Sequence, residues 1–386
     1  MIAVLDDSLL EDSAALAEAD TAGLLRSAAT AGAQFRSTGQ AAAEAGVATL
    51  EGSRPRALVL LIRPGSSVYA VPLVNALLGP ACPVPVVVAT EAPSWIGPLD
   101  VLVAHTADAA DRELADSVSR AVRRGCEVVL SAPGEGPIVA AGAGAARLLE
   151  PRVPVPAGLD FPRALATLLV TVTALGLLKA DLEELATDLD REMERDHLSH
   201  ESFVNPAKAL ALRLADHTPL LWGVDAPGTA VAHYAAATLA AHAAVIGHAA
   251  DVAEAASATG LQRVLARPVQ ADIFHDPFDD PVEATGGAAA LPAPPRILLL
   301  ATEETDPADA VMRHAGRGWA SADTLHLVEE IPPGTPNAVL RRAALLATRF
   351  DVAALYLGLA GRVLGSDLNT DLDTDPDGAR QLSGPA

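Results

Sequence analysis

Short apolar segments alternate with segments of helical periodicity through the first part of the chain. The short segments lie at residues 57–62, 84–89, 101–104 and 127–131. Uninterrupted apolar runs of this length are typical of parallel strands that are covered on both faces. Helical patterns follow them at residues 68–78, 114–124 and 138–149. The alternation predicts a parallel sheet between two layers of helices, with a further short strand at 152–155.

A similar alternation returns after Asn205. Strands are expected at residues 220–224, 296–301 and 324–328. Helices are expected at residues 207–216, 230–244, 308–316 and 339–359. Two more helices precede this region. The one at 161–178 is apolar on all sides, whereas the one at 179–196 is highly charged, which favours a solvated connector.

These patterns predict an α/β protein made of two three-layer αβα sandwiches with parallel sheets, joined by helices. We expect an N-terminal helical segment and the first sandwich within residues 1–180. A helical connector would occupy 181–204, and the second sandwich 205–365. Residues 366–386 are polar and acidic, which predicts a disordered tail.

Charge and composition narrow the possible functions. The net charge of −22 argues against nucleic acid as a partner, because such binding depends on neutralising phosphates. The longest uncharged apolar run, 164–178, is too short to span a bilayer, and no basic segment precedes an apolar one at the N-terminus. We therefore expect a cytoplasmic protein with no membrane partner. Cys82 and Cys126 show no metal-ligand spacing, and neither a metal nor another cofactor is expected.

The segment from Val101 to Ser131 carries the main chemical clue. It predicts a strand, a loop, a helix and a second strand, and a loop before a helix N-terminus is where an α/β protein holds an anion. This loop instead carries Asp108 and Asp111. They could serve as a general base or half of a metal site, or they could complement the helix dipole. His105 ends the strand, where ligand sites form in such folds, so it is a candidate for ligand contact.

Several local patterns together resemble one family. They are Gly65-Ser66, residues 100–131, Phe161-Pro162-Arg163-Ala164-Leu165, Asn205-Pro206-Ala207-Lys208 and residues 352–359. With these patterns the chain resembles the bifunctional phosphoglucose/phosphomannose isomerases, as a divergent member of actinobacterial type. The resemblance implies two SIS (sugar isomerase) domains and a sugar-phosphate ligand. It also implies chemistry that moves a proton between C1 and C2 of the sugar through an enediol.

The resemblance implies a phosphate cradle whose residues are altered here. The Ser-Gly-Asn-Thr loop of the family aligns with residues 108–111, where Asp108 and Asp111 replace hydroxyl donors. In another register, His105 and Thr106 would form the cradle. The second family loop retains Gly65 and Ser66 but has a proline in place of one glycine.

The catalytic positions that the resemblance implies are altered as well. The family's Glu base aligns with Ala241, and its His falls near Ser257. The family's C-terminal Lys has no counterpart, because no lysine follows Lys208. Arg163 matches the family's Arg. No catalytic residue is therefore expected to be retained.

Other candidates leave more than one interpretation open. Ser66 and Ser67 could bind an anion or cap the following helix. Arg163 could clamp a substrate oxygen, cap a helix or pair with Asp160. His275, within the acidic, Pro-rich stretch 272–281, has the most metal-like surroundings, although such a stretch is ordinarily a solvated loop.

The altered positions leave open whether the protein is an enzyme. They predict a degenerate SIS protein that binds a sugar phosphate and acts as a sensor or accessory subunit. The alternative is an active isomerase that converts glucose 6-phosphate or mannose 6-phosphate to fructose 6-phosphate with substitutes such as His105, Asp108 or His242. An interaction protein with an empty cleft is a third possibility. The Ala-rich helix faces around 231–250 and 340–360 favour a homodimer.

Overall fold

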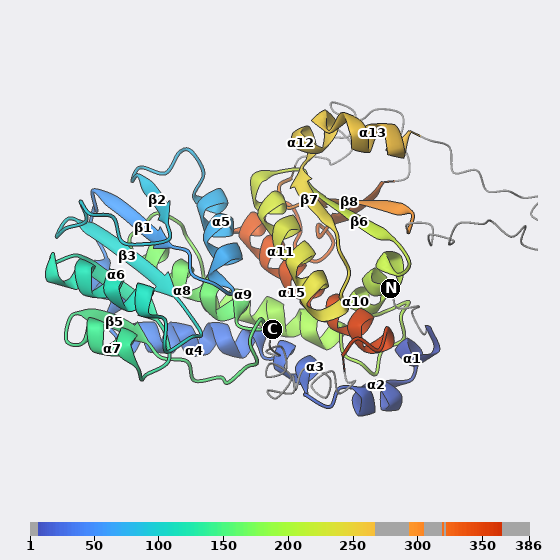
Figure 1. Ribbon diagram of the computed structural model, residues 1–386, viewed down its shortest axis with the longest axis horizontal. Coiled ribbons are helices and arrows are strands. Elements are labelled where there is room, and N and C mark those ends of the chain that lie inside the picture. The colour runs from blue at the N-terminus through green and yellow to red at the C-terminus, as the bar shows by residue number, and fades with distance from the viewer. Residues whose placement is uncertain (1–6, 267–292, 305–318, 320–321, 365–386) are drawn as a thin grey trace, which may run out of the picture.

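The computed structural model describes residues 7–266, 293–304, 319 and 322–364. Within these residues the chain forms two parallel sheets, one from each half of the sequence, with helices around and between them (Figure 1). The expected α/β class is confirmed. The expected helix at 308–316, the loop at 272–281 with His275, and the tail at 366–386 lie outside the described residues.

The first sheet has five parallel strands in the order β2-β1-β3-β4-β5. They are β1 (Ala57–Leu61), β2 (Val86–Ala89), β3 (Asp100–His105), β4 (Glu127–Ser131) and β5 (Ala146–Leu149). The helical elements of this half are α1 (Asp7–Glu11), α2 (Ser13–Ala19), α3 (Leu24–Ala28), α4 (Ala31–Glu44), the 3-10 helix η1 (Val47–Leu50), α5 (Ser67–Leu78), α6 (Arg112–Arg123), α7 (Pro137–Gly142) and α8 (Phe161–Ala174).

The second sheet has four parallel strands in the order β7-β6-β8-β9. They are β6 (Thr218–Gly223), β7 (His248–Asp251), β8 (Pro295–Ala301) and β9 (Asp323–His326). The helices of this half are α10 (Pro206–Leu214), α11 (Ala226–Ala243), α12 (Val252–Ser257), α13 (Thr259–Leu265) and α15 (Ala338–Ala360). The helix α9 (Leu182–Arg195) lies between the halves in the sequence.

Alternate side chains of β3 enter two different cores, as expected for a strand covered on both faces. Leu102 belongs to a core that includes Val118 of α6 and Ile138 of α7. Val103, on the opposite face, belongs to a larger core with Leu165 of α8. Helices therefore cover each face of the first sheet, and polar groups gather at the ends of its strands.

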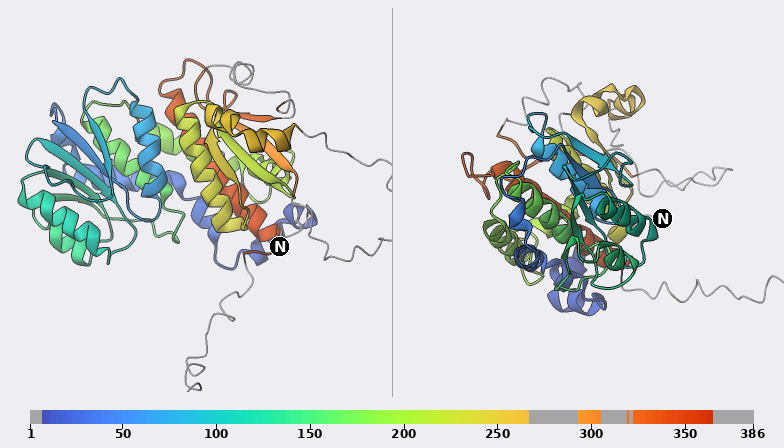
Figure 2. Two further views of the ribbon diagram at one scale, coloured as in Figure 1. Left: turned by 45° about the horizontal axis from the view of Figure 1, so that its top comes forward. Right: turned by 90° about the vertical axis from the view of Figure 1, so that its left-hand side faces the viewer.

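The larger core continues from the first sheet into the second. It contains Leu60 of β1, Phe350 of α15 and Leu298 of β8, all fully buried. The helices α5, α11 and α15 lie between the two sheets (Figures 1 and 2). By length and composition alone α15 could cross a membrane, but its apolar window is 100% buried within the protein. It is the central helix of the core.

Some sequence predictions of local structure are wrong. Residues 138–149 do not form one helix, because α7 ends at Gly142 and the chain turns through Gly144 at φ +78° into β5. Residues 152–155 form no strand. The charged helix α9 is not a solvated connector, because it buries one face that includes Leu185 and Glu192.

Candidate functional site

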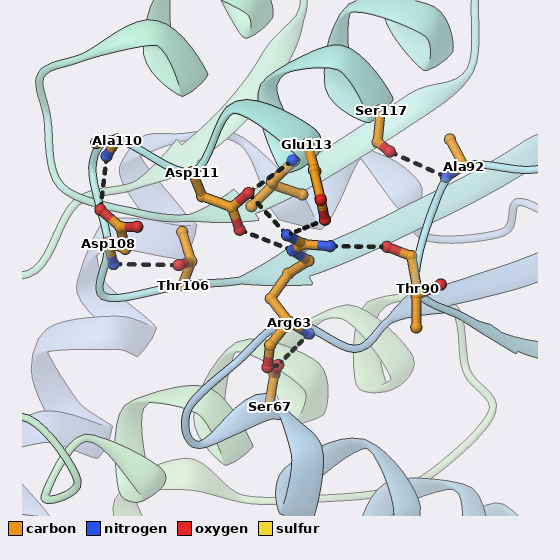
Figure 3. Close-up of polar contacts among 11 residues, drawn as sticks. Arg63, Ser67, Thr90, Ala92, Thr106, Asp108, Ala110, Asp111, Glu113 and Ser117 are labelled. Carbon is orange, nitrogen blue, oxygen red and sulfur yellow. Dashed lines mark hydrogen bonds and ion pairs between the residues drawn. The ribbon is translucent and has the colours of Figure 1, made fainter. Parts of the chain in front are cut away.

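Arg63 lies directly after β1, at the carboxyl edge of the first sheet, and each of its guanidinium nitrogens donates a hydrogen bond within the protein (Figure 3). Nε and Nη2 donate to the two carboxylate oxygens of Asp111 over 2.7 and 2.8 Å. Nη2 also donates to Glu113 over 2.9 Å, and Nη1 donates to the carbonyl of Thr90 over 3.2 Å. This guanidinium therefore holds the loop after β1 against the start of α6.

Asp111 also begins α6. Its Oδ1 accepts a hydrogen bond from the backbone N–H of Leu114 over 2.9 Å, as an N-cap does. Burial opposes ionisation of this carboxyl, but hydrogen bonds from Arg63 and the Leu114 N–H outweigh burial and lower the pKa of Asp111. The interpretation of Asp111 as the N-terminal partner of a helix is confirmed. The exposed side chain of Asp108 does not join this pair and accepts a hydrogen bond from the N–H of Ala110 (Figure 3).

A second group of buried polar side chains lies at the same edge of the sheet. His105 places Nε2 2.9 Å from Oδ2 of Asp160 and Nδ1 3.0 Å from Oγ of Ser131. Ser66 donates to the other oxygen of Asp160 over 2.5 Å. All four residues are at most 5% exposed. The network thus joins the ends of β3 and β4 to the starts of α5 and α8.

Asp160 is ionised within this network. Burial raises the free energy of its charged form, but hydrogen bonds from His105 and Ser66 and the nearby charge of Arg163 outweigh burial. Together they lower the pKa of Asp160 to about 2. The carboxylate is therefore charged at neutral pH and fixes the orientation of the His105 ring.

The serines after β1 do not cap α5 through their side chains. The hydroxyl of Ser66 is taken by Asp160, and that of Ser67 donates to the carbonyl of Arg63 over 2.7 Å. Ser66 therefore holds the N-cap position of α5, as the capping interpretation expected, but its hydroxyl does not form the capping hydrogen bond. Gly65 forms the exposed turn before them at φ +102°, a conformation that favours glycine.

Arg163 lies in the first turn of α8 and lines a cavity of about 440 Å³. The opposite lining comes from Ala107, in the loop after β3, and from residues 151–155. Its guanidinium donates to the carbonyl of Val153 over 2.8 Å. Among the residues that the structure describes, it has no other hydrogen-bond partner and no carboxylate within ion-pair distance. Pairing with Asp160, one of the interpretations left open by the sequence, is therefore not a direct contact.

The second half of the chain reaches this region through α11. The ring of Tyr234 stacks on Phe161 of α8 with centroids 4.0 Å apart, and its hydroxyl donates to Asp351 of α15 over 2.6 Å. The His242 ring lies near Gly158, where a Cβ added to that glycine would stand 3.8 Å from the ring. Burial lowers the pKa of His242, so its ring is neutral at neutral pH. The contact between the halves is thus aromatic and largely uncharged beside the polar network.

The structure unites some of the predicted site residues and separates others. Ser66 and His105 meet through Asp160, and Thr106 follows with its Oγ1 accepting from the N–H of Asp108 over 3.1 Å (Figure 3). Ala241 is exposed on α11, and Ser257 is exposed at the end of α12. Within the described part of the chain, no three His, Cys, Asp or Glu side chains form a metal-binding group.

The sequence did not identify Arg63 or Ser131 as members of the site. It indicated Asp160 only as a possible partner of Arg163. Arg63 and Ser131 stand at the carboxyl ends of apolar strands, where polar residues of a parallel sheet converge. That position is a signal available in the sequence. The pairing of Arg63 with Asp111 across 48 positions is not, because no local pattern connects them.

No protein-family model matches the chain, and no curated protein matches it in sequence. Its fold nevertheless matches solved structures over most of its length. A candidate phosphosugar isomerase from Bacillus subtilis has a TM-score of 0.54 and 14% identity, with 87% of this chain and 96% of that chain covered.

Two structures of other enzymes match to a similar extent. The C-terminal domain of glucosamine-fructose-6-phosphate aminotransferase from Francisella tularensis has a TM-score of 0.55 and 9% identity, covering 87% of this chain and 95% of that chain. For tagatose-6-phosphate ketose/aldose isomerase from Escherichia coli the TM-score is 0.52 and the identity 10%, with coverages of 87% and 90%. The chain therefore has the αβα SIS fold that phosphosugar isomerases share.

Proposed function

We propose that this chain is a two-SIS-domain protein, related to the bifunctional phosphoglucose/phosphomannose isomerases, that binds a sugar phosphate without isomerising it. Its role would be that of a sensor or accessory subunit. The observation that carries the proposal is Arg163, a buried guanidinium with one hydrogen bond beside a cavity of about 440 Å³. A buried cation that lacks a carboxylate partner is suited to an anionic ligand.

The proposed position of the anion, beside Arg163, differs from the position expected for a hydroxyl-lined cradle. Arg63 is already neutralised by Asp111 and Glu113, and the hydroxyls of Ser66 and Ser67 donate within the protein. A phosphate placed there would face the buried carboxylate of Asp111, whose repulsion is about 4 kcal/mol at 4 Å and an effective dielectric of 20, together with the solvent-screened carboxylate of Glu113. On the Arg163 side of the loop the charge of Asp160 acts from beyond ion-pair distance, so less repulsion is expected there and this side is the preferred anion position.

We infer the absence of isomerase chemistry from the residues that could act as the base. Both ring nitrogens of His105 are engaged, one with Asp160 and one with Ser131, so neither is left for a substrate proton. Ala241 has only a methyl group where the related isomerases place their base. We therefore expect binding without proton transfer.

Binding is tested by calorimetric titration of the full chain with glucose 6-phosphate, mannose 6-phosphate and fructose 6-phosphate. Arg163→Gln should weaken binding at least about tenfold, or roughly 1.4 kcal/mol, because a charge-assisted contact is lost. Arg112→Gln, an exposed arginine at the start of α6, is the matched control and should leave affinity within about twofold.

The same preparations are assayed for interconversion of the three sugar phosphates. No turnover is expected. Turnover that Arg163→Gln abolishes would establish the alternative of an active isomerase. Absence of binding at millimolar ligand would instead favour an interaction protein, and it would remove the sugar-phosphate proposal.

Three further properties belong to this proposal. Two SIS domains would occupy residues 1–180 and 205–365, joined by the connector at 181–204. The protein would be cytoplasmic and homodimeric, and light scattering of the purified full chain measures the oligomeric state directly.

A further inference from the structure

A separate cavity lies under the N-terminal helices, away from the sheet edge that carries Arg163. It measures about 590 Å³. Its lining comes from α2, α3, the end of α9 and α15, and it is mostly apolar: Ala17, Leu25, Ala29, Met193, Leu198, Val352 and Tyr356. The remaining lining residues are Asp20, Arg26, Asp196 and His197. An apolar cavity with few polar groups is typical of a small-molecule site.

Asp196 is the unusual member of this lining. It is 2% exposed, and its Oδ1 accepts from the backbone N–H of Ala207 over 2.9 Å. Its backbone carbonyl accepts from the hydroxyl of Tyr356 over 2.6 Å. Its Oδ2 is buried and has no hydrogen-bond partner among the described residues. A buried carboxyl oxygen without a partner costs free energy unless a ligand or a proton satisfies it.

The charges around Asp196 leave it short of a cation. Glu192, one turn earlier on α9, is bound by Arg349 over 2.6 Å and also pairs with Arg195. Both arginines also reach Glu330, over 2.7 Å from Arg349 and 3.5 Å from Arg195. Two guanidinium groups are thus shared by two carboxylates, and neither makes an ion pair with Asp196.

The other ionisable groups near the cavity do not supply that cation. Asp20 is occupied by the backbone N–H groups of Leu24 and Leu25. Lys208 of α10 donates to the carbonyl of Leu198, not to Asp196. Arg26 and His197 are exposed at the cavity and make no ion pair with Asp196. The carboxyl therefore balances its charge by holding a proton.

We propose that this cavity binds a small apolar primary amine, whose ammonium group donates to Oδ2 of Asp196 while its hydrocarbon part fills the space between α3, α9 and α15. An ammonium supplies the missing positive charge and the missing donor in one group. The apolar lining gains from excluding water around the hydrocarbon part.

The proposal has a proton-linked consequence. Burial and the neighbouring Glu192 raise the pKa of Asp196, which favours the protonated carboxyl in the absence of a cation. An ammonium ion within hydrogen-bond distance favours the carboxylate and displaces that proton. Binding at pH 7 should therefore be accompanied by net proton release.

The test is calorimetric titration of the full chain with hexylamine at pH 7 in cacodylate and in HEPES, which differ in ionisation enthalpy. Saturable binding with net proton release is expected. Hexanol and hexanoate should bind at least about tenfold more weakly, because neither supplies a positive charge. Absence of hexylamine binding, or equal binding of hexanol, would overturn the proposal.

Variants locate the site. Asp196→Asn should weaken hexylamine at least about tenfold and remove the proton release, whereas Glu194→Gln on the exposed side of α9 should change neither. Ala29→Trp fills the cavity from its exposed rim and should block binding without altering the core. Unchanged affinity in both Asp196→Asn and Ala29→Trp would refute this site. Arg163→Gln should leave hexylamine binding intact, which separates this result from the sugar-phosphate titration.

Discussion

The guanidinium of Arg63 and the carboxylate of Asp111 form a two-pronged ion pair, and each side chain is only 8% exposed. The pair connects the loop after β1 to the N-terminus of α6. In this protein the carboxylate of Asp111 thus binds the guanidinium that a bound anion would otherwise contact.

Removing one member of this pair should destabilise the fold. Arg63→Ala leaves Asp111 buried without its counter-charge, at an expected cost of about 3 kcal/mol. The double variant Arg63→Met/Asp111→Leu should cost less than Arg63→Ala, because it leaves no unpaired charge. Urea unfolding monitored by circular dichroism measures both. Equal stability of the wild type and Arg63→Ala would show that the pair is energetically neutral.

Freeing Arg63 should change the anion preference of the site. Asp111→Thr keeps a hydroxyl that can cap α6 and removes the carboxylate that binds the guanidinium through both oxygens, leaving the exposed Glu113 as a carboxylate partner of Arg63. We expect inorganic phosphate to bind this variant about tenfold more tightly than it binds the wild type, equivalent to 1.4 kcal/mol. Asp116→Thr, an exposed change on α6, is the control. An unchanged phosphate affinity in Asp111→Thr would place the anion away from Arg63.

The order of strands and helices can be predicted because each depends on local patterns. Uninterrupted apolar runs predict β1, β3 and β4, and the helical pattern predicts α6, which is followed by Gly125 at φ +73°. The prediction for 138–149 is wrong because a short apolar run fits a helix or a strand equally well. There the glycines at 142 and 144 decide the outcome.

The site is less accessible to prediction than the fold. Asp111 can be expected to cap a helix from its sequence position, but its ion pair with Arg63 joins two loops 48 positions apart. His105 is a candidate because it ends a strand. Its partner Asp160 lies 55 positions further along and depends on how α8 packs against the sheet. Such pairings arise from tertiary packing, which a single sequence does not display.

Asp160 should contribute to acid stability. Its pKa is lowered to about 2 from 3.8, so its interactions stabilise the folded state above about pH 4 and are lost as the pH falls toward 2. The loss should approach about 2 kcal/mol. Asp160→Asn should be less stable at pH 5 and show a smaller decline between pH 4 and 2. Urea unfolding at a series of pH values checks this, and parallel curves for both proteins would contradict it.

Asp351 should have the opposite effect. Burial raises its pKa to about 7 from 3.8, although hydrogen bonds from Tyr234 and Thr238 favour the charged form. The unfolded chain ionises first, so this group's contribution to stability is lost as the pH rises from about 4 to about 7. Asp351→Asn should therefore be more stable than the wild type at pH 8, by as much as about 4 kcal/mol. Thermal unfolding at pH 4 and pH 8 measures the difference, and a gap that does not widen with pH would refute the assignment.

The core that runs from Leu60 through Phe350 to Leu298 has a consequence for how the chain can be divided. A cut in the connector at 181–204 would separate α5 and α8 from α11 and α15, and each fragment would expose an apolar helical face to water. We therefore expect that neither half would fold stably when expressed alone. The two sheets repeat an architecture, but they share one hydrophobic core.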